Sequence, residues 1–94
     1  VDVSIGRHVH VNLDCTIGHD VVLGDFSTLA PGVHVSGYVH FGDGVYVGTG
    51  AAFINGSAAA PLRIGAAAVV GAGAVVTREV AAGTTVVGVP ARAR

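Results

Sequence analysis

Five histidines are the side chains of this sequence best suited to chemistry near neutral pH. The most suggestive is His19, because Asp20 follows it directly and a carboxylate beside an imidazole can orient the ring. Such a pair could remove a proton from an attacking amine or hydroxyl group. A solvated corner of a protein often shows the same pair without any activity, so the surrounding elements must decide between the two interpretations.

The other four histidines are candidate metal ligands; they are His8, His10, His34 and His40. A catalytic zinc ion is usually held by three protein ligands and keeps one position open. His8 and His10 would face the same side of a strand, whereas His34 and His40 are six residues apart. This spacing does not gather three ligands, so scattered surface imidazoles are the better interpretation and no metal is expected.

A repeat of six residues predicts the elements that carry these side chains. Large apolar residues stand at nine consecutive positions spaced by six: Ile5, Val11, Ile17, Leu23, Leu29, Val35, Phe41, Val47 and Phe53. The position after each is usually Gly or small, and a small or β-branched residue comes four positions after each. This period fits neither an α-helix nor simple strand alternation.

The repeat is typical of a β-solenoid, in which each unit is one short strand and one corner. The large apolar residue would point inward, and the small residue after it would allow the backbone to turn. Three units close a triangular coil of about eighteen residues, which predicts an all-β parallel fold of roughly five coils over residues 5–81. Gly37 follows His19 by 18 residues, so we expect it one coil beyond His19.

The repeat is interrupted once. The next unit after Phe53 begins at Ile64, so five extra residues must lie within the segment 55–62, which reads NGSAAAPL. Its turn-forming composition predicts a loop that leaves the coil, either as a tolerated insertion or as the wall of a binding cleft. After Val80 the pattern gives way to a closing strand and a Pro-containing tail over residues 82–94.

Composition excludes several classes of function. A net charge of -1 with only five Lys and Arg residues argues against nucleic-acid binding. No apolar run is long enough to cross a membrane as a helix. Cys15 has no second cysteine to pair with, which favours the cytoplasm, and its small inward position indicates an inert thiol. The chain starts at Val1 and contains no Met, so we expect a single domain, residues 1–94, of a longer protein.

The units, which read aliphatic, Gly, any two, small, any, resemble those of the hexapeptide-repeat acyltransferases. This resemblance implies a left-handed parallel β-helix. Residues 17–51 and 64–92 more narrowly resemble the sialic acid O-acetyltransferase and bacillosamine N-acetyltransferase type of sugar acetyltransferase. It implies a homotrimer with acetyl-CoA between neighbouring β-helices, a nucleotide-linked sugar as acceptor, and a preceding α/β domain that this chain lacks.

The resemblance also assigns roles to residues. It places the catalytic base on His19 and its orienting carboxylate on Asp20. It implies that acetyl-CoA contacts six further positions, namely Thr28, Ser36, Gly37, Thr49, Ala72 and Gly73. The Gly37 amide is the candidate for holding the thioester oxygen, and Arg92 or Arg94 could meet the phosphates of the cofactor. Thr28 departs from the pattern, because a second His commonly stands there.

Three functions follow from the sequence. The first is direct acetyl transfer from acetyl-CoA to an amino or hydroxyl group of a sugar. The second is a non-catalytic trimerising scaffold. The third and weakest is a metalloenzyme of the γ-carbonic anhydrase type, whose pair of histidines five residues apart is not found here.

Overall fold

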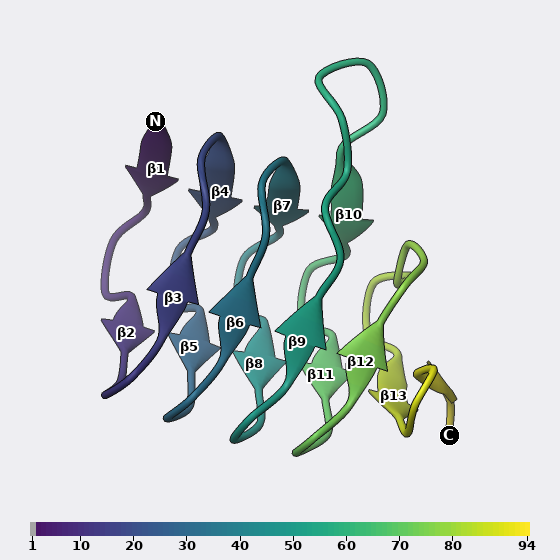
Figure 1. Ribbon diagram of the computed structural model, residues 1–94. Coiled ribbons are helices and arrows are strands. Elements are labelled where there is room, and N and C mark those ends of the chain that lie inside the picture. The colour runs from purple at the N-terminus through teal and green to yellow at the C-terminus, as the bar shows by residue number, and fades with distance from the viewer. Residues whose placement is uncertain (1) are drawn as a thin grey trace.

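The computed structural model describes residues 2–94; Val1, the first residue of the predicted domain, lies outside the described part. The described residues form fourteen short strands and no helix, and therefore no helix that could span a membrane (Figure 1). The strands are β1 (Val3–Ile5), β2 (His10–Val11), β3 (Thr16–Ile17), β4 (Val21–Leu23), β5 (Thr28–Leu29), β6 (His34–Val35), β7 (Val39–Phe41), β8 (Tyr46–Val47), β9 (Ala52–Phe53), β10 (Leu62–Ile64), β11 (Val69–Val70), β12 (Val75–Val76), β13 (Thr85–Val87) and β14 (Arg92–Ala93).

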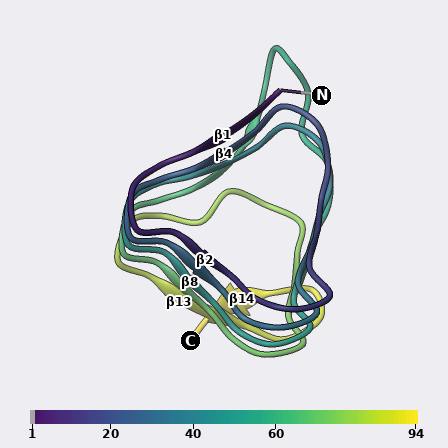
Figure 2. The same ribbon diagram turned by 90° about the vertical axis from the view of Figure 1, so that its left-hand side faces the viewer.

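From β1 to β12, every third strand pairs in parallel with the strand one coil away, which creates three flat faces. Face A contains β1, β4, β7 and β10; face B contains β2, β5, β8, β11 and β13, with β14 at its edge; face C contains β3, β6, β9 and β12. Val3 pairs with Val21 and Thr16 pairs with His34, so one coil takes eighteen residues, as the sequence predicts. Figure 2 shows the resulting triangle along its axis.

The β-helix is left-handed. In Figure 1 the near strands β3, β6, β9 and β12 run upward, the far strands run downward, and the coil advances from left to right. Parallel crossovers in ordinary sheets favour the right hand, so this sense is a property of the repeat. There are four complete coils and a partial fifth, in agreement with the predicted number.

The inward positions of the repeat form one core along the axis. From Leu23 onward, the large apolar position of every unit is buried, and so are the small positions from Val21 to Ala51. The first coil differs, because Ile5 is 54% and Val11 is 42% exposed. These side chains have the correct inward register, but only one neighbouring coil covers them.

Glycine has two separate roles in the coil. At some positions it adopts the left-handed backbone of the turn, and at others it lets neighbouring coils approach closely. The left-handed backbone occurs three positions after most of the large apolar residues, as at Asp20 (φ 55°), Tyr38 (φ 59°) and Gly50 (φ 74°). The Gly directly after the large residue is required for a different reason. A Cβ on Gly48 would lie 2.6 Å from the backbone nitrogen of Ala72 in the next coil. The prediction that this Gly permits the turn was therefore wrong, since it permits the close approach of coils.

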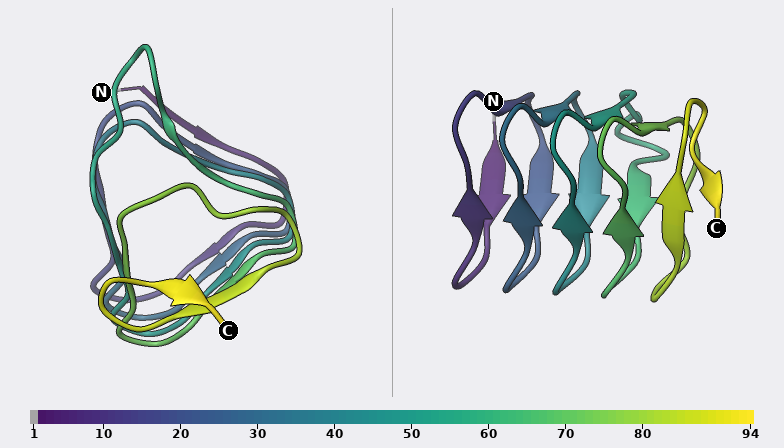
Figure 3. Two further views of the ribbon diagram at one scale, coloured as in Figure 1. Left: turned by 90° about the vertical axis from the view of Figure 1, so that its right-hand side faces the viewer. Right: turned by 90° about the horizontal axis from the view of Figure 1, so that it is seen from below.

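The loop excursion is confirmed and can be placed to the residue. The Gly56 N–H donates to the Gly37 carbonyl and the Leu62 N–H donates to the adjacent Tyr38 carbonyl, so the five extra residues are 57–61. Their loop stands out from one corner of the triangle in Figures 2 and 3. Ser57, assigned by the repeat to an inward position, is exposed in this loop, and Leu62 takes the inward place.

The C-terminal end of the β-helix has a shortened coil and one antiparallel strand. Val69 pairs with Thr85, so the last coil is shorter by two residues than the regular ones. The chain then turns back, and β14 pairs antiparallel with β13, with Val87 opposite Arg92 (Figure 3). The predicted Pro-containing tail thus ends in an edge strand, which places Arg92 at the C-terminal end of face B.

A ladder of carboxylates joins the coils at the corner between faces A and B. The Arg7 N–H donates to Asp25 Oδ1 (2.7 Å), and the Asp25 N–H donates to Asp43 Oδ1 (2.8 Å). The Arg7 guanidinium also contacts Asp25 Oδ2 at 3.2 Å. The backbone hydrogen bond from Arg7, followed by the one from its side chain, lowers the pKa of Asp25.

We expect the variant Asp25→Asn to lose stability in a pH-dependent way. Because the pKa of Asp25 is lower in the folded protein, the carboxylate stabilises the fold above its ordinary pKa of about 3.9, and this contribution disappears as the pH falls through the folded value. Urea unfolding should therefore show the variant to be less stable at neutral pH, with the difference shrinking in acid. An equal difference at both pH values would contradict the assigned cause.

Candidate active site

His19 and Asp20 form a hydrogen-bonded pair at the corner between faces C and A, where β3 ends and β4 begins. His19 Nδ1 lies 2.9 Å from Asp20 Oδ2. The left-handed φ of Asp20 turns the chain there, and its side chain remains beside that of its neighbour. The hydrogen bond to His19 is the main cause that lowers the pKa of Asp20. The ionised carboxylate accepts a hydrogen bond from the Nδ1–H of the imidazole. In the neutral ring, Nε2 then keeps its lone pair.

The imidazole of His19 lies over Gly37, which is one coil further along, as the spacing predicts. A Cβ on Gly37 would be 2.7 Å from His19 Nε2 and 2.8 Å from Cε1. The ring of Tyr38 stands edge-on to the imidazole, with ring centroids 5.1 Å apart and an interplanar angle of 89°. The Gly37 backbone and the Tyr38 ring therefore limit where the imidazole of His19 can lie.

The backbone N–H of Gly37 is an available donor next to this imidazole. Within residues 2–94 it donates to no carbonyl or side chain, whereas its counterparts at the A/B corner, Arg7 and Asp25, donate to carboxylates of the next coil. The corner between faces C and A thus offers a lone pair on Nε2 and a free N–H close together.

The remaining predicted cofactor contacts lie elsewhere on the triangle. Thr49, Ala72 and Gly73 are exposed at the corner between faces B and C, where the Gly73 N–H donates to the Thr49 carbonyl (2.8 Å). Thr28 lies on β5 of face B, between His10 and Tyr46 of the flanking strands. Of the eight predicted site residues, the single chain therefore places only Asp20, Ser36 and Gly37 at the same corner as His19.

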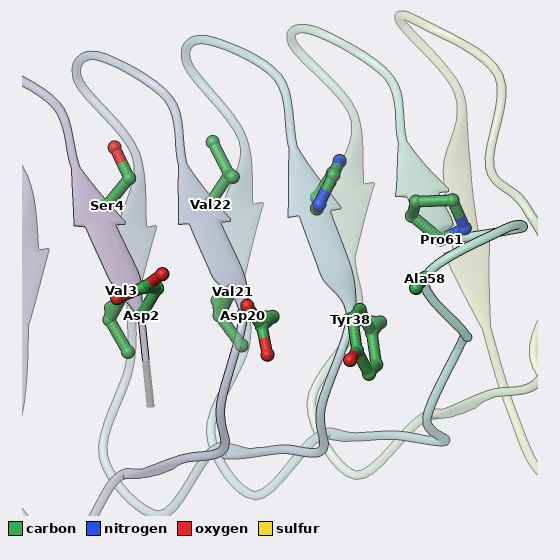
Figure 4. Close-up of a pocket in the computed structure, with 10 residues that line it drawn as sticks. Asp2, Val3, Ser4, Asp20, Val21, Val22, Tyr38, Ala58 and Pro61 are labelled. Atoms are coloured by element: carbon green, nitrogen blue, oxygen red, sulfur yellow. The ribbon is translucent and has the colours of Figure 1, made fainter.

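A groove of about 460 Å³ runs along face A beside the His19 corner (Figure 4). Its lining residues are Asp2, Val3, Ser4, Asp20, Val21, Val22, Tyr38, His40, Ala58 and Pro61. The last two belong to the loop excursion, so the excursion contributes to the wall of a cleft. Sequence reasoning missed Tyr38 and placed His40 among scattered surface imidazoles. The signal for Tyr38 was its place eighteen residues after Asp20.

Three other candidate side chains, those of His34, His8 and Cys15, make contacts that support the fold. His34 Nδ1 lies 2.7 Å from Thr16 Oγ1, and the ring of His8 stacks on that of Phe26. In the part of the chain that the structure describes, no three His, Cys, Asp or Glu side chains come close enough to hold a metal ion. The Cys15 thiol donates to the Ala30 carbonyl (3.2 Å) and packs against the core.

Several known proteins are similar to this chain. GDP-perosamine N-acetyltransferase from Escherichia coli O157:H7 is 49% identical over 88 residues, which are 94% of this chain and 40% of that protein. WeeI from Acinetobacter baumannii AYE superposes with a TM-score of 0.97 at 47% identity, over 99% of this chain and 44% of its own. Over nearly its whole length, the chain is similar to the hexapeptide-repeat part of these acetyltransferases. It spans less than half the length of these two relatives.

A third similar protein has been solved with two molecules bound. It is a His-to-Asn mutant of perosamine N-acetyltransferase from Caulobacter crescentus, in complex with CoA and GDP-perosamine. It matches 98% of this chain at 30% identity with a TM-score of 0.72, over 50% of its own length. No family model matches the chain.

Proposed function

We propose that this β-helix catalyses the transfer of an acetyl group from acetyl-CoA to the amino group of a nucleotide-linked sugar. The observation that carries the proposal is the His19–Asp20 pair stacked on Gly37, whose N–H is available. The names of the relatives support an amino group, rather than a hydroxyl group, as acceptor.

In this proposal His19 is the general base. Its Nε2 accepts a proton from the acceptor amine as the amine nitrogen attacks the thioester carbonyl carbon. The new C–N bond forms, and the carbonyl electrons move to the oxygen. When the tetrahedral intermediate collapses, the C–S bond breaks and the CoA thiolate takes the proton back from His19. The products are the N-acetyl sugar and CoA, and no covalent enzyme intermediate is needed.

Asp20 and Gly37 support this step in different ways. Asp20 is a positioning residue: it holds the Nδ1 proton and stabilises the imidazolium that forms when His19 accepts a proton. The Gly37 N–H donates to the carbonyl oxygen as negative charge develops on it. A donor that is already oriented toward such an oxygen is among the larger contributions to acyl transfer.

The complete cofactor site requires more than one copy of the chain. Thr49, Ala72 and Gly73 lie at the B/C corner, whereas His19, Ser36 and Gly37 lie at the C/A corner. A homotrimer in which the B/C corner of one copy faces the C/A corner of the next would bring both sets of residues together. Thr28, on face B, would lie at the edge of that shared site. Partly exposed apolar residues on face B, namely Tyr46, Val69 and Val87, support burial against a neighbour.

We place this reaction in the cytoplasm. The proposed donor is an intracellular thioester, and the single thiol of Cys15 suits a reducing compartment. The binding partners are then small molecules and further copies of the chain, with no role for nucleic acid or a membrane.

The test combines binding, mass and turnover on the same sample. Calorimetry should show acetyl-CoA binding, light scattering should give the mass of a trimer, and release of CoA should depend on GDP-perosamine, the acceptor in the names of the relatives. A trimer that neither binds acetyl-CoA nor releases CoA would favour the scaffold function instead. A monomer that binds acetyl-CoA would overturn the shared site.

A further inference from the structure

Asn55 lies one coil beyond Gly37 at the corner between faces C and A, and no role has been assigned to it. Strand β9, which precedes it, pairs with β6, and the Gly56 N–H donates to the Gly37 carbonyl (3.0 Å). Asn55 therefore keeps the register of the coil, although it opens the segment that the repeat assigns to the excursion. His19, Gly37 and Asn55 form one column at this corner, each one coil beyond the last.

The corner between faces A and B shows where an oxygen lies when it accepts a hydrogen bond from a corner N–H. The Arg7 N–H donates to Asp25 Oδ1 at 2.7 Å, and the Asp25 N–H donates to Asp43 Oδ1 at 2.8 Å. In both cases the accepting oxygen belongs to the side chain of the residue one coil further along. An oxygen on a corner N–H thus lies where the side chain of the next coil stands.

The Gly37 N–H has the same orientation as the Asp25 N–H. The residue after each donates its N–H to the carbonyl one coil back, Phe26 at 2.8 Å and Tyr38 at 3.0 Å. The residue before each donates to a carbonyl one coil ahead. Because the flanking hydrogen bonds match, the Gly37 N–H points toward the side chain of Asn55, and an oxygen bound to it lies beside that side chain.

We propose that Asn55 is a further catalytic residue, whose Nδ2 donates a second hydrogen bond to the thioester oxygen that the Gly37 N–H holds. This inference rests on the proposed function and adds to it a side chain that acts on the developing negative charge. Both donors keep their protons. The charge on the oxygen is lost again when the carbonyl re-forms and the C–S bond breaks.

A carboxamide suits this place, whereas a carboxylate would not. The Asn55 Nδ2 donates a long hydrogen bond (3.3 Å) to the carbonyl of the adjacent Gly56, and within residues 2–94 its second N–H and its Oδ1 have no partner. An aspartate here would accept the Gly37 N–H, as Asp25 accepts that of Arg7, and would repel an oxyanion. Asn55 instead adds a donor, because a carboxamide carries two N–H groups.

The first experiment measures kcat for the unmodified chain, Asn55→Ala and Asn55→Asp, with GDP-perosamine as acceptor and saturating acetyl-CoA. Asn55→Ala should lower kcat about a hundredfold, the usual effect of removing one oxyanion donor. Asn55→Asp should lower kcat at least as much, because its carboxylate occupies the Gly37 N–H and opposes the charge. The affinity of Asn55→Ala for acetyl-CoA, measured by calorimetry, should stay within about twofold, since the contact strengthens only in the transition state.

Ala66→Asp is the matched control for the added charge. Ala66 is exposed at the A/B corner, one coil beyond Asp43. The variant therefore places a carboxylate beside a corner N–H, as Asn55→Asp does, but away from the proposed site. Its kcat should equal that of the unmodified chain.

The second experiment observes the contact without turnover. Asn12 and Asn55 are the only carboxamide side chains in the sequence, so the NMR signals of the Asn55 Nδ2 group are identified by their absence in Asn55→Ala. Acetyl-CoA should shift these signals and the Gly37 amide signal further than CoA does, because only acetyl-CoA carries a thioester oxygen.

Two results would overturn the role of Asn55 and leave the proposed function standing. One is a kcat of Asn55→Ala within about twofold of the unmodified chain. The other is an equal shift of the Asn55 signals by acetyl-CoA and by CoA. An unmodified chain that neither binds acetyl-CoA nor releases CoA would instead overturn the proposed function, and the role of Asn55 with it.

Discussion

His19→Ala should reduce acetyl transfer by about a hundredfold or more while acetyl-CoA still binds. The variant removes the Nε2 lone pair that accepts the amine proton but leaves Gly37 and the coil backbone in place. Steady-state CoA release and calorimetry on the same preparation measure the two quantities separately. If transfer falls in proportion to acetyl-CoA affinity, His19 is a binding residue and the assigned base is wrong.

Two further variants test the same site from different sides. Asp20→Asn should lower kcat with little change in KM, because the amide replaces the carboxylate that holds the His19 Nδ1 proton and stabilises the imidazolium. Gly37→Ala should lower kcat without unfolding the protein, since the three atoms nearest to its Cβ belong to the far end of the His19 side chain and the ring can move aside. His8→Ala should change neither parameter. Normal transfer by Gly37→Ala would contradict the position assigned to His19.

Gly48→Ala should destabilise the β-helix by about 3 kcal/mol, a large effect for a single methyl group. Gly48 is buried, and its Cβ would lie 2.6 Å from the Ala72 nitrogen and 2.9 Å from the Ala72 Cα. Both are backbone atoms of a paired coil, so relief requires that coils separate. Urea unfolding followed by circular dichroism measures the change.

Gly50→Ala is the matched control, two residues away at the same corner. Gly50 has a left-handed φ of 74°, but a Cβ there would meet no atom within 4 Å. Its cost is only the backbone preference of a residue with a side chain, about 1 kcal/mol. Ala67, with φ of 60°, shows that the coil accommodates Ala at the equivalent position. Equal losses for Gly48→Ala and Gly50→Ala would mean that coil spacing does not depend on the Gly that follows the large apolar residue.

The sequence by itself determined the coil. A six-residue pattern repeated without interruption over nine units can bury its large residues only if every unit adopts the same strand and corner. The eighteen-residue coil, the inward register and the five-residue length of the excursion all follow from counting. The nearness of His19 and Gly37 follows as well, because parallel stacking without slippage places residues one coil apart next to each other.

Only the tertiary structure decided what surrounds His19. The groove is formed by side chains from three coils and by Ala58 and Pro61 of an excursion that has left the repeat, so no local pattern predicts it. The role of Gly48 depends on its distance to the backbone of the next coil, a quantity that the six-residue period does not contain. The exposed core of the first coil and the antiparallel β14 have the same origin, since a repeat specifies how units stack and does not specify how a stack ends.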